Sequence, residues 1–147
     1  MSLLSRFTPV VVCAAVISAS QPCSAGEKLS VTIKNPKEGE EVGAVYNGFS
    51  ASVGGELADG HFLWIFVVDK FGGKFQQWPR PLIVSPGKVR ATNIRTATSG
   101  SFFFQVVIAD ANAHRFLMAR VRARKWDALD ELPEGARAVA SVSIRRR

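Results

Sequence analysis

Alternating apolar and polar residues predict several half-buried β-strands. Residues 29–34 and 49–53 place an apolar side chain at every second position, which is the period of a strand with one buried face. Residues 137–145 repeat this pattern near the end of the chain. There we expect four apolar side chains to share one face: Ala138, Ala140, Val142 and Ile144. Residues 89–94 predict a weaker strand.

Two longer apolar runs predict central strands. Residues 61–68 and 102–109 are apolar almost throughout, as expected of strands that are buried on both faces. Aromatic and β-branched residues dominate both runs, and this composition favours strand over helix. In the second run we expect alternate residues to share one face: Phe102, Phe104, Val106 and Ile108.

Turn residues separate these runs. Residues 35–39 combine a proline, which fixes φ, with a glycine, which frees it, and so predict a turn. Residues 71–74 contain two glycines and predict a hairpin turn. The short segment 75–78 follows and ends at Pro79. Because proline cannot donate to a sheet, we expect this segment to lie at a sheet edge.

The stretch 111–125 fits two structures. Four apolar residues have the spacing of one helical face: Ala113, Phe116, Leu117 and Val121. Either Asp110 or Asn112 can cap the first turn of such a helix. Residues 117–124 also alternate small or apolar residues with Met118 and three arginines, as on a strand. We predict a short helix here, and a loop at 129–135.

About seven short strands with turn residues between them are typical of a two-sheet sandwich. The predicted fold is therefore all-β, an immunoglobulin-like sandwich with one short helix in a late crossover. The chain of 147 residues is enough for one such domain. With 47% hydrophobic and 21% charged residues, its composition is that of a globular protein.

The first 25 residues have the three parts of a secretory signal peptide. Arg6 belongs to a short positive region, residues 9–19 form an apolar run, and small residues precede a cleavage site after Ala25. Cleavage after Ser20 and retention as an uncleaved anchor are the alternatives, although the run is short for a bilayer span. We predict an exported protein, periplasmic or extracellular, whose domain covers residues 26–147 and carries no transmembrane anchor.

Cleavage after Ala25 removes both cysteines, Cys13 and Cys23. Neither follows a small residue, which argues against lipid attachment. The mature domain would then be held together by its core alone, which about 120 residues can supply. Thiol nucleophiles and iron–sulfur clusters are excluded from such a chain.

The net charge of +7 and a pI near 10.0 favour anionic partners. We expect an anionic envelope polymer or a protein partner. Export makes nucleic acid a poor physiological candidate, and no motif that binds DNA or RNA is present. The alternative is that the charge serves solubility alone.

Several segments carry a resemblance to a known family: Asn35-Pro36 with Gly39 and Val42; Leu63-Trp64; Gln77-Trp78-Pro79; Gly100, Phe102 and Val106; Ala109-Asp110-Ala111 with Ala113; and Leu129, Leu132-Pro133 and Gly135-Ala136. Together they resemble small extracytoplasmic bacterial immunoglobulin-like domains of unknown function, across nearly all of residues 29–145. The resemblance implies a fold but no catalytic residues. The arginine-rich segment 120–125 and the terminal arginines at 145–147 lie outside the shared pattern.

Catalytic and metal chemistry find little support in the sequence. His61 and His114 are the only histidines, and neither has the spacing of a metal ligand pair. Asp110 and Asn112 begin like a calcium loop, but the required glycine and distal glutamate are missing, so helix capping is the better interpretation. We predict no cofactor, no metal site and no enzyme activity.

Two groups of residues are candidates for ligand binding. Phe75, Trp78 and Arg80 combine aromatic rings with a cation on the predicted edge segment. The alternative is that both rings cover the edge of the sandwich. Residues 115–125 form the densest positive segment, from which Arg120, Arg122 and Arg124 are the candidate ligand contacts. The alternative there is a solvated face.

The sequence predicts a secreted, non-catalytic binding or interaction module. The alternative is a structural accessory subunit of an envelope protein complex, which would bury an apolar edge against a partner chain.

Overall fold

The computed structural model describes residues 29–147 except 78–80, 83, 85–86 and 97–98. The predicted signal peptide therefore lies outside the described residues, as do two candidate ligand contacts, Trp78 and Arg80. In the described part of the chain, ten strands and one helix confirm that the protein is mostly β. No helix in this part is long and apolar enough to cross a membrane.

The strands form two main sheets and a small third one. The three-stranded sheet has the antiparallel order β1 (Ser30–Asn35), β4 (Phe49–Gly54), β7 (Lys88–Ala91). The five-stranded sheet has the order β2 (Glu40–Val42), β10 (Ala136–Arg146), β9 (Gly100–Ala109), β5 (Phe62–Val68), β6 (Lys74–Gln76). Its β2–β10 pair is parallel and its other pairs are antiparallel. A two-stranded sheet pairs β3 (Val45–Tyr46) with β8 (Ile94–Arg95).

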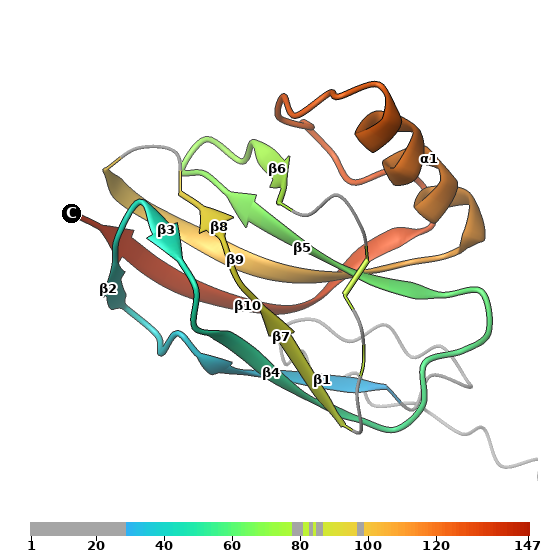
Figure 1. The fold of residues 1–147 in the computed structure, drawn as a ribbon, viewed down its shortest axis with the longest axis horizontal. Helices are drawn as coiled ribbons and strands as arrows, with labels where there is room; N and C mark the ends of the chain where they lie inside the picture. Colours follow the sequence, from blue (N-terminus) through green and yellow to red (C-terminus); the bar gives the residue numbers. More distant parts are fainter. Residues whose placement is uncertain (1–28, 78–80, 83, 85–86, 97–98) are drawn as a thin grey trace, which may run out of the picture.

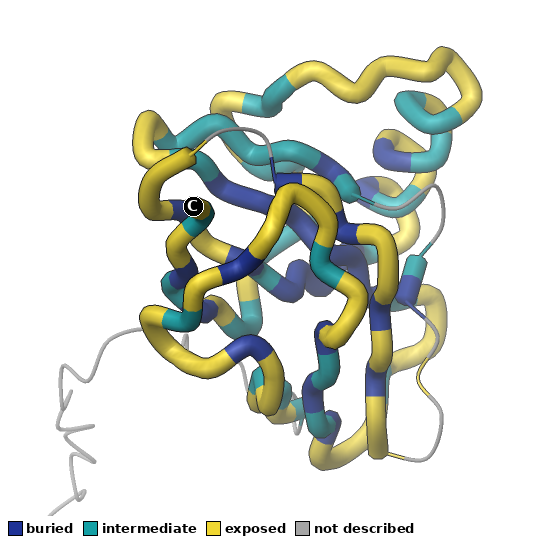
Figure 2. The backbone as a smooth tube through the Cα atoms, turned by 60° about the vertical axis from the view of Figure 1, so that its left-hand side comes forward, coloured by how far each residue is buried: buried dark blue, intermediate teal, exposed yellow. Residues whose placement is uncertain are grey.

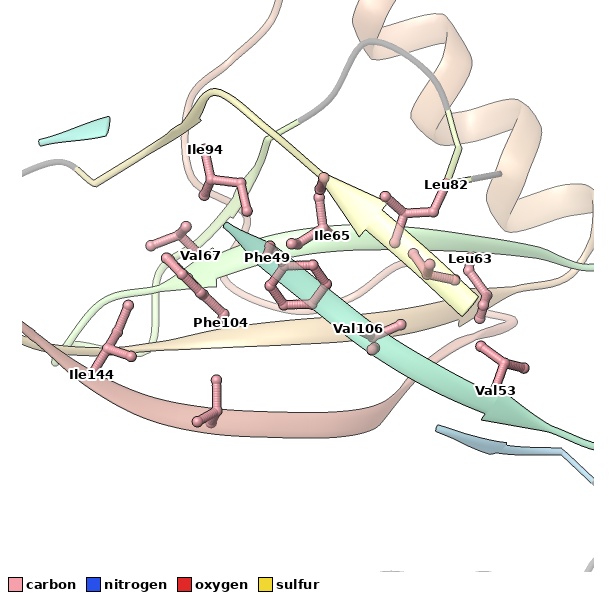
Figure 3. Packing of buried hydrophobic residues seen from close by; sticks show 14 of the residues in the cluster. Phe49, Val53, Leu63, Ile65, Val67, Leu82, Ile94, Phe104, Val106 and Ile144 are labelled. Carbon is pink, nitrogen blue, oxygen red and sulfur yellow. The ribbon is translucent and has the colours of Figure 1, made fainter. Parts of the chain in front are cut away.

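Strand β5 is buried on both faces, as its apolar sequence predicts. Leu63, Ile65 and Val67 belong to a core that also contains residues of β4, β7, β9 and β10. This core lies between the three-stranded and five-stranded sheets, and Figure 3 shows side chains from both sheets meeting in it. Trp64 and Phe66 point the other way, into a second and smaller core.

The helix α1 (Ala111–Arg122) covers that second core. It lies on the outer side of the five-stranded sheet, away from β1, β4 and β7 (Figure 1). Ala113 and Leu117 are its buried residues and pack against Trp64, Phe66, Val107 and Ala109. The prediction of a helix rather than a strand is therefore confirmed. The prediction that Phe116 lies on the buried face is wrong, because this residue is 45% exposed.

Both ends of α1 have hydrogen-bonded caps. The Asp110 carboxylate accepts the Ala113 N–H at 2.8 Å, which confirms the predicted capping role. At the other end, the Arg124 and Lys125 N–H groups donate to carbonyls of the last turn, at Val121 and Arg120. This is a Schellman motif, and it places Arg124 in the left-handed region with φ of 53°.

Two predicted strands differ in the structure because the backbone breaks their periodicity. Residues 89–94 do not form one strand: β7 ends at Ala91, and β8 begins at Ile94 in a different sheet. Asn93 makes the break, with φ of 55°. In β10, the register shifts between Ala138 and Ala140. Because this irregularity changes the face of the strand, Ala138 is exposed and does not share the buried face of Val142 and Ile144.

Candidate functional site

A cleft of about 500 Å³ opens beside β6, the edge strand of the five-stranded sheet. Its lining comes from three segments that are far apart in sequence: Val67 with Phe75, Gln76 and Gln77; Asn93 with Arg95; and Trp126. The volume lies within the range of about 300–1,000 Å³ that is typical of ligand sites. The cleft is therefore the first place to look for a binding function.

Gln77 joins the first two of these segments. Its backbone N–H donates to the Ile65 carbonyl at 3.1 Å and extends the β5–β6 pairing by one residue. Its side-chain oxygen accepts the Arg95 N–H at 2.8 Å, which fixes β8 beside the end of β6. The Asn93 N–H donates to the Asn47 side chain at 2.8 Å. One wall of the cleft is thus a hydrogen-bonded junction between two sheets.

Trp126 forms its part of the cleft from the loop after α1. This loop is exposed along most of its length (Figure 2). Its first anchor is Arg120, whose guanidinium donates to the Asp127 carbonyl at 2.6 Å and lies 3.3 Å from the Asp127 carboxylate. The Arg120 side chain is only 11% exposed. The residues on either side of Trp126 are therefore tied to the end of the helix.

The second anchor of this loop is a short pairing with β6. The Lys74 N–H and carbonyl exchange two hydrogen bonds with Leu129, at 2.9 and 2.8 Å. The Lys74 ammonium also donates to the Asp130 carbonyl at 2.9 Å. Because both anchors are fixed, Trp126 is presented at the cleft although its own side chain is 44% exposed.

The lining combines two aromatic rings, three carboxamides and one cation. Among the described residues that line it, none is a carboxylate, histidine, serine or cysteine. Arg95 has no acidic partner in the described part of the chain. An electropositive cleft with aromatic walls suits an anionic ligand that has an apolar ring face. It offers no group of ordinary acid–base or nucleophilic reactivity.

The structure brings together part of each predicted binding group. Phe75 lines the cleft, whereas Trp78 and Arg80 lie outside the described residues. Arg122 and Arg124 are exposed at the end of α1, close in sequence to Trp126, and Arg120 is engaged with Asp127. Neither Arg122 nor Arg124 lines the cleft.

Phe75 is the only described lining residue among the predicted ligand contacts, and the predictions include neither Trp126 nor Arg95. Trp126 had one signal: it is a tryptophan between charged residues, directly after a basic run. Such a residue is expected to be exposed, and an exposed tryptophan is a common contact residue. Arg95 had no distinguishing signal, because its place in the cleft depends on the break at Asn93.

The histidines lie away from the cleft lining. His114 belongs to α1 and stacks on Phe62 of β5, with ring centroids 3.7 Å apart; its ring centroid lies 5.6 Å from that of Trp64. Burial lowers the pKa of His114 below its ordinary value. Among the described residues, no three metal-ligating side chains gather into a possible ion site.

The residues that the structure describes form a mostly β protein with one helix packed on a sheet and a cleft at the sheet edge. No protein-family model matches the chain, and no curated protein matches it.

Proposed function

We propose that this protein is an exported, non-catalytic binding module with an immunoglobulin-like sandwich, and that it takes an anionic envelope component into the cleft beside β6. One observation carries the proposal: a cleft of about 500 Å³ whose described lining residues include two aromatic rings and an arginine but no carboxylate. That combination attracts an anion and offers apolar contact at the same place.

The sheet order supports the immunoglobulin-like part of the proposal. The orders β1-β4-β7 and β10-β9-β5-β6 correspond to the A-B-E and G-F-C-C′ orders of a variable-type domain. The parallel β2–β10 pair lets the first part of the chain contribute to both sheets. Trp64 departs from the antibody pattern, in which a tryptophan on strand C lies between the sheets, because it faces α1.

The N-terminal sequence supports export. Residues 1–25 have the three parts of a signal peptide: a short positive region, an apolar run and small residues before a cleavage site. An exported protein meets envelope polymers, which are rich in carboxylates and phosphates. These anionic polymers are suitable partners for the basic chain. N-terminal sequencing of the mature protein tests export directly, and an intact Met1 on cytoplasmic protein would refute it.

The residues that line the cleft support the non-catalytic part of the proposal. General acid–base catalysis needs a group that exchanges a proton near neutral pH, and nucleophilic catalysis needs an activated hydroxyl, thiol or amine. Carboxamides, aromatic rings and a guanidinium do neither at ordinary pH. They bind and orient.

The binding function is tested with the mature domain and isolated envelope fractions. We expect Arg95→Gln and Trp126→Ala to weaken binding to these fractions. Lys34→Gln on β1 is the charge control, and Phe116→Ala is the aromatic control because Phe116 is 45% exposed and Trp126 44%. Binding should decline as salt is raised. Equal binding by all four variants would refute the proposal.

One observation favours a second candidate, a structural accessory subunit of an envelope complex. Phe71 is 85% exposed at the tip of the β5–β6 hairpin. The Asp69 carboxylate accepts the N–H groups of Phe71 and Gly73 at 2.9 and 2.8 Å, so the tip is held rigidly. A rigid exposed ring is typical of a protein contact. Purification at native level distinguishes this candidate: it requires a stoichiometric partner that Phe71→Ser releases.

A further inference from the structure

We infer that the ligand of the cleft is an acidic saccharide, bound with a sugar ring against Trp126 and Phe75 and its carboxylate on Arg95. The inference rests on the proposed binding function and specifies the chemical class of the ligand. It depends on the juxtaposition in one cleft of two aromatic residues, carboxamides and a cation that has no acidic partner among the described residues.

The aromatic side chains supply apolar ring faces. Trp126 is 44% exposed, and Phe75 is partly buried at the edge strand. Neither ring stacks on another aromatic ring of the described chain, whereas His114 of α1 stacks on Phe62. Unstacked rings at a solvent-accessible cleft fit the apolar C–H face of a pyranose, which is flat on one side and polar at its rim.

The carboxamides match the polar rim of a sugar. The Gln77 side chain is oriented by its bonds to the Arg95 N–H at 2.8 Å and to the Phe75 carbonyl at 3.4 Å. The Asn93 side chain is exposed at the cleft, while its backbone N–H is already bonded to Asn47. A carboxamide both donates and accepts, which is what neighbouring hydroxyl groups require. A purely apolar ligand would not use the hydrogen-bonding capacity that these side chains offer at the cleft.

Arg95 selects the acidic form of the sugar. Its guanidinium has no acidic partner among the described residues, and no carboxylate lines the cleft to repel an anion. A guanidinium forms two parallel hydrogen bonds with a carboxylate, so a single arginine suffices to bind one uronic acid group. The positive segment of residues 115–125 adds long-range attraction for the rest of a polyanionic chain.

The test compares two probes on the mature protein by calorimetry: a tetrasaccharide of galacturonic acid, and the same tetrasaccharide with its carboxyl groups reduced to neutral alcohols. We expect the acidic probe to bind more tightly. Arg95→Gln should weaken the acidic probe by about tenfold or more and leave the neutral probe unchanged. Trp126→Ala should weaken both probes, and Phe116→Ala neither. Circular dichroism verifies that each variant is folded.

The outcomes separate the two levels of the proposal. Equal affinity for both probes, or an Arg95→Gln variant that binds the acidic probe normally, overturns the acidic-saccharide assignment while a binding module with another ligand stands. Binding to envelope fractions without binding to either tetrasaccharide also overturns the acidic-saccharide assignment. A nucleotide or phosphodiester polymer that competes for this binding would then identify the ligand class. Failure of both probes and of the envelope fractions overturns the proposed function itself.

Discussion

The connection between the two ends of the α1 crossover is tested most sharply by Gly135→Ala. Gly135 precedes β10 with φ of 85°, and its carbonyl accepts the Asp110 N–H at 2.9 Å. A Cβ atom at Gly135 would overlap the Asp110 carboxyl group. That same carboxylate caps α1 through the Ala113 N–H at 2.8 Å. Gly135→Ala therefore has two effects: it strains the backbone at residue 135 and displaces the Asp110 carboxylate that caps α1.

The two effects have separable magnitudes. An L-residue in the left-handed region costs about 1–2 kcal/mol, and loss of an N-terminal cap costs about 1 kcal/mol. Gly135→Ala should therefore lower the free energy of unfolding by about 2–3 kcal/mol. Gly60→Ala is the matched control, because Gly60 has φ of 75° with open space around its missing side chain. It should lose only the backbone term.

Urea unfolding of the mature domain measures these losses. In an Asp110→Ala background no carboxyl group remains to be displaced, so the double variant should be more stable than the sum of the single losses predicts. We expect a coupling of about 1 kcal/mol. Equal losses for Gly60→Ala and Gly135→Ala, or strict additivity in the cycle, would show that Asp110 and Gly135 do not interact as described.

Three further predictions concern the helix layer. Leu117→Ala should lower the free energy of unfolding by about 3–4 kcal/mol because it leaves a cavity against the sheet. Phe116→Ala should lower it by less than about 0.5 kcal/mol. Similar losses for the two variants in urea unfolding would contradict the orientation of the helix. Arg124→Gly should raise stability by about 1 kcal/mol, because glycine suits the left-handed position; thermal unfolding measures this, and a loss would refute it. Because burial lowers the pKa of His114, the unfolded chain binds a proton at higher pH than the folded one. Stability should therefore fall as the pH drops through 6.5, and His114→Gln should show a smaller fall.

The central strands could be predicted because their pattern is local. In Leu63 and Trp64, consecutive apolar residues imply two buried faces, and the structure supplies a core for each. The sequence indicated less clearly that α1 covers the second core, because this helix has only two buried residues, Ala113 and Leu117. Phe116 has the spacing of the buried face but is exposed, so the apolar pattern of α1 predicts a wider buried face than the helix has.

The short strands and the cleft could not be predicted because they depend on non-local contacts. Strands β2, β3 and β8 have two or three residues each, too few to show a period. The cleft requires that Asn93 break the chain and that Leu129 pair with Lys74, 55 positions earlier. Phe75 was found because proline and aromatic residues mark an edge. Trp126 reaches the same edge only through the anchors of its loop.

The capture of Arg120 by Asp127 affects how charge-removal experiments on the basic segment should be interpreted. Replacing Arg120 releases the tie that seats Trp126, so the resulting defect would persist at every ionic strength. Replacing Arg122, which is exposed, removes only distant attraction, and its effect would fade in concentrated salt. The binding defects of these two variants would therefore depend differently on salt, although the arginines are only two residues apart. A variant that replaces both would combine the displacement of Trp126 with the loss of a charge that salt screens.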